Sequence, residues 1–344
     1  MHTQINLVQE SSSWKQLKSF LEPAVRQCVP SELNGSLKGR QIIFGSGESK
    51  LVPIHGWTFK NKHVDSPLTT IRAVKEETTI LAVDSSSIQI AETEEGAIYA
   101  VKIGITTAIL GQILAHFKMG PILFYLSEDT LKHSELDSRI IKLVLLDSES
   151  AKRLIRIRVE RAIQLELSQH FSGSILLVDG SLRSSIFEYR LHTLRKVVED
   201  CSLYKNTIVG LSKSTKIKIL DKISQPLTKI RGPGFMDVDL IIKSLTRNTI
   251  GDGLLVKFGS SYTSPILRAD ISTAVGDRSR SLGKILGNDS IARGYPETLQ
   301  LAHHISTFTT TEISCLKSHI LNKYDVIELV SEDLRKKLLG SLPV

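Results

Sequence analysis

The chain has 344 residues, of which 41% are hydrophobic and 23% charged, the balance of a soluble globular protein with one large domain or two to three small ones. No apolar run approaches the roughly 18 residues that span a bilayer, and the start lacks the apolar stretch of a signal peptide. We therefore expect a cytoplasmic protein with no membrane contact. The three scattered cysteines exclude a disulfide framework and argue against a thiolate zinc site.

The net charge of +8 and the pI of about 9.3 indicate a basic surface. Such a surface suits nucleic acid, an acidic membrane or an acidic partner, and does not choose among them.

The first 75 residues predict a helix and a small β-rich module. An apolar stripe at helical spacing predicts a helix over 13–28. From 35 to 70, short apolar pieces lie between glycines and prolines, which is typical of a small barrel-like β module. Within it, 44–50 (FGSGESK) lacks the G-x-x-x-x-G-K-[ST] pattern, so we expect no ATP binding.

Continuous apolar residues over 78–84 (TTILAVD) predict a strand that is covered on both faces. Two further strands, 85–92 and 97–105, suggest a meander that opens an α/β sheet. A long helix is expected over 147–170, capped by either Asp147 or Ser148. We assign it one apolar face and a basic side formed by Lys152, Arg156, Arg158 and Arg161.

The second half alternates again between strands and helices. A strand over 174–181 precedes a predicted helix over 183–200. Further strands are expected at 207–214, 253–259 and 264–272, and then a helix from Pro296 to 321 and a short amphipathic segment over 330–341. The predicted division is an N-terminal region over residues 1–75, a main α/β domain over 76–320 with a β-rich insertion at about 215–275, and a C-terminal partner-binding or packing segment over 321–344.

Asp84 and Asp179 each come directly after an apolar strand and before small residues. Either residue alone is as well explained by a turn, because Asp and Ser favour turns. Two such strand ends, with Glu160 on the long helix between them, favour a shared acidic site. Clustered carboxylates repel one another unless a cation compensates, and oxygen ligands select Mg²⁺ or Mn²⁺.

Five ordered motifs resemble the NurA family of nucleases, over roughly residues 78–320. They are AVDSSS around Asp84, RVERAIQLEL around Glu160, LLVDGS around Asp179, GLSKS around Lys213 and GYPETLQLAH over 294–303. The resemblance implies a ribonuclease-H-like α/β fold, with a mixed sheet and helices on both faces. It implies a Mn²⁺-dependent (or Mg²⁺-dependent) nuclease with two ions that resects DNA 5′ to 3′ and cuts single strands internally.

The same resemblance assigns roles to individual residues. Asp84, Glu160 and Asp179 align with the metal-binding acids, and Tyr295 and His303 fall in the C-terminal active-site motif. His303 can bind metal or contact the scissile phosphate. Position in the motif selects it over the adjacent His304. Lys213 is a candidate phosphate contact, although a solvated lysine is nearly as good an explanation from the residues alone. Ser85 departs from the glycine expected after the first Asp.

The implied partners are DNA, a HerA-like hexameric ATPase and a second copy of the chain in a homodimer. Asp270 is a candidate auxiliary acid, and the basic stretches 216–231 and 278–284 are candidate DNA contacts or solvated faces. The alternative functions are a catalytically silent nuclease-fold scaffold or DNA-binding subunit of a motor complex, and an RNA-directed enzyme on the same fold.

Overall fold

The computed structural model describes residues 12–29, 33, 37–44, 66–133, 136–189, 192–213, 217, 219–273 and 277–328. Its helices are α1 (Ser12–Cys28), α2 (Glu128–Lys132), α3 (Ser138–Leu146), α4 (Ser148–His170), α5 (Leu194–Leu203), α6 (Ile219–Ile223), α7 (Gln225–Thr228), α8 (Asp239–Leu245), α9 (Arg278–Asn288), α10 (Glu297–Ser306) and α11 (Thr310–Tyr324). Its strands are β1 (Gln41–Phe44), β2 (Thr69–Thr70), β3 (Ile80–Glu92), β4 (Gly96–Ile109), β5 (Gln112–Ser127), β6 (Ile175–Asp179), β7 (Thr207–Ser212), β8 (Gly234–Asp237), β9 (Asp252–Lys257), β10 (Leu267–Thr273), β11 (Ile291–Ala292), β12 (Tyr295–Pro296) and β13 (Ile327–Glu328).

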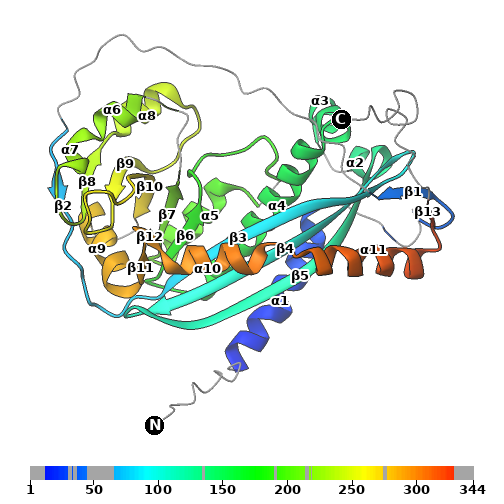
Figure 1. Ribbon diagram of the computed structural model, residues 1–344, viewed down its shortest axis with the longest axis horizontal. Coiled ribbons are helices and arrows are strands. Elements are labelled where there is room, and N and C mark those ends of the chain that lie inside the picture. Colours follow the sequence, from blue (N-terminus) through cyan, green and yellow to red (C-terminus); the bar gives the residue numbers. More distant parts are fainter. Residues whose placement is uncertain are drawn as a thin grey trace, which may run out of the picture.

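One large mixed sheet organises the molecule (Figure 1). Its main order is β5-β4-β3-β6-β7-β10-β9-β8-β2. The central pairs β3–β6 and β6–β7 are parallel, and the other pairs along this path are antiparallel. At its far end β3 also pairs with β1, which pairs in turn with β13. The structure confirms the α/β class with a mixed sheet and helices on both faces.

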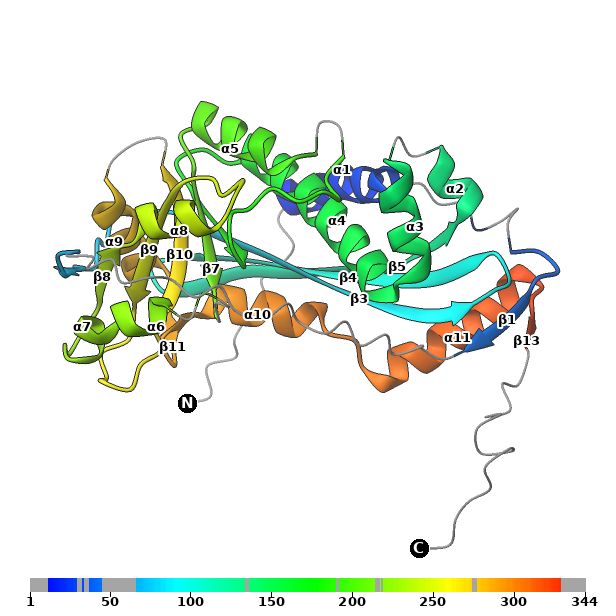
Figure 2. The same cartoon turned by 90° about the horizontal axis from the view of Figure 1, so that it is seen from above.

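The two faces of the sheet carry separate apolar clusters. Because side chains alternate along a strand, Leu81 and Val83 of β3 lie in the cluster beneath α4, and Ile80 and Ala82 lie in the cluster beneath α10. Figure 2 shows α1, α4 and α5 on one side of the sheet and α10 and α11 on the other. Within the described residues, every helix is too short or too polar to cross a lipid bilayer.

Strand β3 is longer than the strand that the sequence predicted over 78–84. The predicted break after Asp84 is wrong, because β3 continues to Glu92 and pairs with β4 through the serine run. The serines do not turn the chain, since two of their hydroxyls find partners on α4. Ser85 Oγ donates to Glu160, and Ser87 Oγ donates to the carbonyl oxygen of Lys152. The expected meander is therefore made of β3, β4 and β5.

The long helix α4 begins at its cap Asp147, whose carboxylate accepts from the Ser150 backbone N–H at 2.9 Å. Its predicted basic side is only half right. Arg158 and Arg161 are buried, at 0% and 5% exposure. A buried guanidinium needs hydrogen-bond partners, and Phe187 and Glu188, which follow β6, supply one to each arginine. Lys152 and Arg156 remain on the outer face.

Two predicted helices differ from the structure. The described residues 183–189, 192 and 193 form no helix, and α5 begins only after Thr193, whose hydroxyl caps it. The expected helix from Pro296 is two helices, because Thr309 and Glu312 form a capping box that starts α11 afresh. In the expected β-rich module, residues 45–65 lie outside the described residues, while β1 and β2 join the large sheet. The expected segment 330–341 also lies outside them.

Helix α10 rests directly on the backbone of β4. A Cβ atom at Gly104 would lie 2.1 Å from the carbonyl oxygen of Ala302, so only glycine permits this approach. Gly104 pairs with Asp84 on β3. This close contact therefore fixes the distance between α10 and the part of the sheet that carries Asp84.

The junction between α10 and α11 is held by charge. Lys102, buried on β4, donates to the carbonyl oxygen of Thr307 at 2.6 Å and to Glu312 at 2.8 Å. Lys118 reaches the same carboxylate at 3.2 Å. The hydrogen bond from Lys102, the Thr309 backbone N–H and Lys118 lower the pKa of Glu312 to about 2.

Replacing Gly104 by alanine should destabilise the protein by about 2–4 kcal/mol, because the added methyl group forces α10 off β4. Urea unfolding would measure the loss. The matched control is Gly111→Ala, which adds a methyl group with nothing within 4 Å at a positive φ of 77° and should cost only about 1 kcal/mol. Equal losses for the two variants would contradict the close approach of α10.

Replacing Glu312 by glutamine should lower stability at neutral pH. The folded-state pKa is below the ordinary value of 4.5, so the stabilisation is fully present above pH 4.5 and is lost as pH falls toward about 2. Unfolding midpoints of wild type and Glu312→Gln, measured from pH 3 to 7, should converge as the pH falls. A gap between the two proteins that is independent of pH would show that Glu312 carries no such linkage.

Candidate functional site

The site forms where two parallel strands diverge. The β3–β6 register runs from Ile80 opposite Ile175 to Val83 opposite Val178. Asp84 and Asp179 are the next residues on the two strands, so their side chains leave the sheet on the same face. Asp179 ends β6 as predicted, and Gly180 turns the chain at a φ of +113°. Asp84 is not at a strand end, as the sequence suggested, but lies inside β3 where its pairing with β6 stops.

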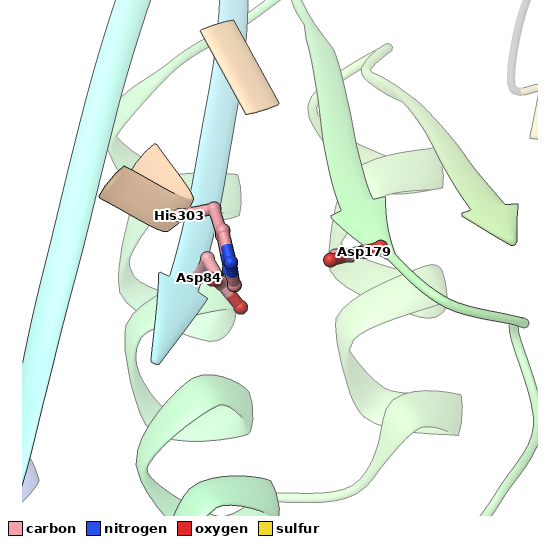
Figure 3. Close-up of side chains that lie close together, drawn as sticks. All are labelled: Asp84, Asp179 and His303. Atoms are coloured by element: carbon pink, nitrogen blue, oxygen red, sulfur yellow. Dashed lines mark hydrogen bonds and ion pairs between the residues drawn. The ribbon is translucent and has the colours of Figure 1, made fainter. Parts of the chain in front are cut away.

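Asp84 is buried against α10, with 4% exposure. His303 Nδ1 lies 2.7 Å from Asp84 Oδ2, and the Ser306 hydroxyl donates to the same oxygen at 3.1 Å. His303 and Ser306 are three residues apart and therefore share one face of the helix. An ionised carboxylate only accepts, so His303 Nδ1 carries the proton of this hydrogen bond, and Nε2 is the ring nitrogen left for another partner. Figure 3 shows His303 beside Asp84, with Asp179 facing them.

Asp179 has a donor on each oxygen. The Tyr295 hydroxyl donates to Oδ1 at 3.2 Å, and Lys213 Nζ donates to Oδ2 at 2.9 Å. Lys213 also lies over the Tyr295 ring, 5.0 Å from its centroid. Burial, and then the negative charge of Asp179, raises the pKa of Tyr295. The phenol therefore stays protonated and keeps its role as a donor.

Asp84, Asp179 and His303 converge. One oxygen from each carboxylate and one ring nitrogen all lie within 4.8 Å of one another. Two carboxylates this close repel, and a cation between them removes the penalty. Two carboxylate oxygens and one imidazole nitrogen form a donor set that Mn²⁺ or Mg²⁺ accepts. The three side chains therefore fit a divalent metal ion.

Glu160 approaches the same region from α4, on the other face of the sheet. Its Oε1 accepts from the Ser85 hydroxyl at 2.5 Å and lies 4.0 Å from Arg156 Nε. Burial raises the pKa of Glu160; Arg156 opposes the rise and the charge of Asp84 adds to it. Glu160 is thus electrostatically coupled to Asp84 but stands outside the group of three converging ligands.

Sequence reasoning missed Ser306, although its place three residues after His303 was a usable signal. Asp270, the candidate auxiliary acid, lies inside β10, where its carboxylate binds Arg268 at 2.9 Å and accepts from the Leu182 backbone N–H at 3.0 Å. His304 lines a different hollow of about 550 Å³, beside Lys102.

All three basic residues of the stretch 278–284 form ion pairs with acidic side chains of this chain, Arg278 with Asp237, and Arg280 and Lys284 with Glu76, the last two at 2.6 and 3.2 Å. In the first basic stretch, Lys216 and Lys218 lie outside the described residues.

A mixed sheet with central parallel strands, helices on both faces and acidic side chains where those strands diverge defines a ribonuclease-H-like α/β protein. Residues 78–307 match the family model of the NurA domain, which is more than half of the chain. The chain therefore belongs to the NurA family.

The chain is similar to several solved NurA structures. The NurA nuclease from Sulfolobus solfataricus is 14% identical, with a TM-score of 0.45 over 74% of this chain and 88% of that one. A second NurA structure is 11% identical, with a TM-score of 0.47 over 79% and 92% of the two chains. A NurA bound to dAMP and manganese is 12% identical, with a TM-score of 0.46 over 74% and 90%. No curated protein matches the chain.

Proposed function

We propose that the protein is a metal-dependent DNA nuclease that hydrolyses phosphodiesters at the Asp84–Asp179 site. The observation that carries the proposal is the convergence of Asp84, Asp179 and His303 within 4.8 Å, in a chain of the NurA family. The net charge of +8 suits a polyanionic substrate, because positive surfaces attract the phosphate backbone.

Asp84, Glu160 and Asp179 would hold Mn²⁺ or Mg²⁺, two ions in the full site. When bound, such ions stabilise the negative charge that develops on the oxygens around a phosphorus under attack. Glu160 approaches from α4, on the other face of the sheet from Asp84, Asp179 and His303, and would complete the set of metal ligands from that side. Its burial favours the neutral acid, so cation binding and ionisation of Glu160 support each other.

His303, Lys213 and Tyr295 act on the substrate and on the acids. Asp84 orients the His303 ring through Nδ1, which leaves Nε2 to take a metal ion or a proton from the scissile phosphate region. Lys213, with its side chain 47% exposed, can contact a phosphate beside Asp179. The Tyr295 hydroxyl holds Asp179 in place, and its position beside this carboxylate makes it the second candidate for substrate binding.

The finer activity follows the family resemblance. We assign 5′ to 3′ exonuclease activity on single- and double-stranded DNA, endonuclease activity on single strands, and a role in DNA end resection and double-strand break repair. The proposed assembly is a homodimer that works in the cytoplasm with a HerA-like hexameric ATPase. If movement along DNA is needed, its energy comes from that partner, since the sequence lacks a phosphate-loop motif.

The test is degradation of end-labelled linear DNA in Mn²⁺, followed on a denaturing gel. Asp84→Ala and Asp179→Ala should each lower the rate at least about a thousandfold, because each removes a metal ligand. Lys213→Ala should lower it less, by about a hundredfold, because it removes one donor to the reacting phosphate. EDTA should stop the wild-type reaction.

The matched control is Asp325→Asn, which removes an exposed carboxylate at a φ of 50°, where asparagine is well tolerated. It should leave the rate unchanged. Full activity of Asp84→Ala in a clean preparation would contradict the site. A wild type that binds DNA without cutting it would contradict the nuclease assignment and favour the scaffold function.

A further inference from the structure

A groove of about 890 Å³ opens from the proposed active site along the outer face of α4. One wall is the row Lys152, Arg156 and Glu160, whose members are four residues apart and therefore lie one turn apart on a single helix face. The other wall is the segment 180–187 that follows β6. Asp179 and Glu160 both line the groove, whereas Asp84 and His303 do not, so the groove reaches two acids of the proposed site.

The wall opposite α4 is fixed in place by arginines and by Asp270. Arg158 Nε donates to the carbonyl oxygen of Phe187 at 3.1 Å, and Arg161 pairs with Glu188 at 3.3 Å. The other end of the segment is held by Asp270, which accepts from the Leu182 backbone N–H. The buried side of α4 thus anchors this wall, and the groove needs no rearrangement to form.

The side chains left facing the groove are suited to a nucleic-acid strand. Arg156 projects from α4 and Arg183 from the opposite wall, and both are exposed. Lys152 lies one turn beyond Arg156 and pairs with the exposed Glu149. Ile186 stands on the second wall with 63% exposure, an apolar surface against which a base can pack.

The exposed apolar side chain favours one strand over two. Bases in a duplex are paired and stacked on one another, whereas the bases of a single strand are free to pack against Ile186, and basic residues on both walls can contact the phosphates of that strand.

We infer that this groove binds the single strand of DNA that leads into or out of the active site. Arg156 and Arg183 clamp its phosphates from the two walls, and Ile186 packs against a base. The inference rests on the proposed nuclease function. It also gives Asp270, Arg158 and Arg161 a positioning role, since they hold the second wall.

The test measures binding of a labelled twelve-nucleotide oligo-dT and of a blunt twelve-base-pair hairpin duplex, in the Asp84→Asn background with Mg²⁺ so that cleavage does not interfere. The variant is Arg156→Gln combined with Arg183→Gln. Its affinity for oligo-dT should fall roughly tenfold, and the slope of log K against log salt should fall by about 1.4, or about 0.7 for each lost phosphate contact.

The matched control is Lys317→Gln combined with Lys323→Gln on α11, which removes the same formal charge from a different helix. It should keep the oligo-dT affinity and the salt slope. Thermal unfolding confirms that both double variants are folded. Equal oligo-dT binding by the two double variants, or a loss confined to the duplex, would overturn the inference. Cleavage by the unaltered protein is measured separately. If the groove variant binds oligo-dT normally, the nuclease assignment still stands. If the unaltered protein does not cleave DNA, that result contradicts the nuclease assignment and not the binding of oligo-dT in the groove.

Discussion

The separation of β3 and β6 after Val83 and Val178 is the constraint on which the site depends. Up to that point the two strands share backbone hydrogen bonds, and their side chains are buried and apolar. Beyond it Asp84 and Asp179 stand side by side on one face, where their negative charges repel. The protein offsets this repulsion with Lys213 and Tyr295 on one carboxylate and with His303 and Ser306 on the other. A divalent cation does so more strongly, because it binds both carboxylates at once.

The helices and strands around the site fix the positions of these side chains relative to the sheet. Gly104 lets α10 rest on β4, which brings His303 down to Asp84. Lys102 and Glu312 fix the point where α10 ends and α11 begins. On the other face, neighbouring turns of α4 carry Glu160, whose side chain is largely buried, and Arg156, whose side chain is exposed. One helix thus contributes both an acid of the site and a cation of the groove that leads to it.

The sequence predicted the features that depend on local pattern. The apolar strand before Asp179 and the helix α4 with its acid follow from periodicity, and the choice of His303 over His304 follows from its position in the motif that resembles the NurA family. The structure brings Asp179 and His303 together with Asp84, while Glu160 lies on the other face of the sheet, bonded to Ser85. It could not predict that β3 continues through three serines, because their hydrogen-bond partners lie on a helix about 65–75 residues further along the chain. Nor could it separate Arg158 from Arg156, since both look like solvated positions until the packing of the residues after β6 is known.

The central claim is that Asp84 and Asp179 hold a divalent metal ion, and anomalous diffraction from crystals soaked in Mn²⁺ would test it most directly. The geometry predicts an anomalous peak for one Mn²⁺ ion within bonding distance of both carboxylates, with His303 or Glu160 as a further ligand. Asp84→Asn crystals soaked in the same way should show no such peak. Crystals in which manganese binds only elsewhere, while Asp179 keeps its bonds to Lys213 and Tyr295, would contradict the claim.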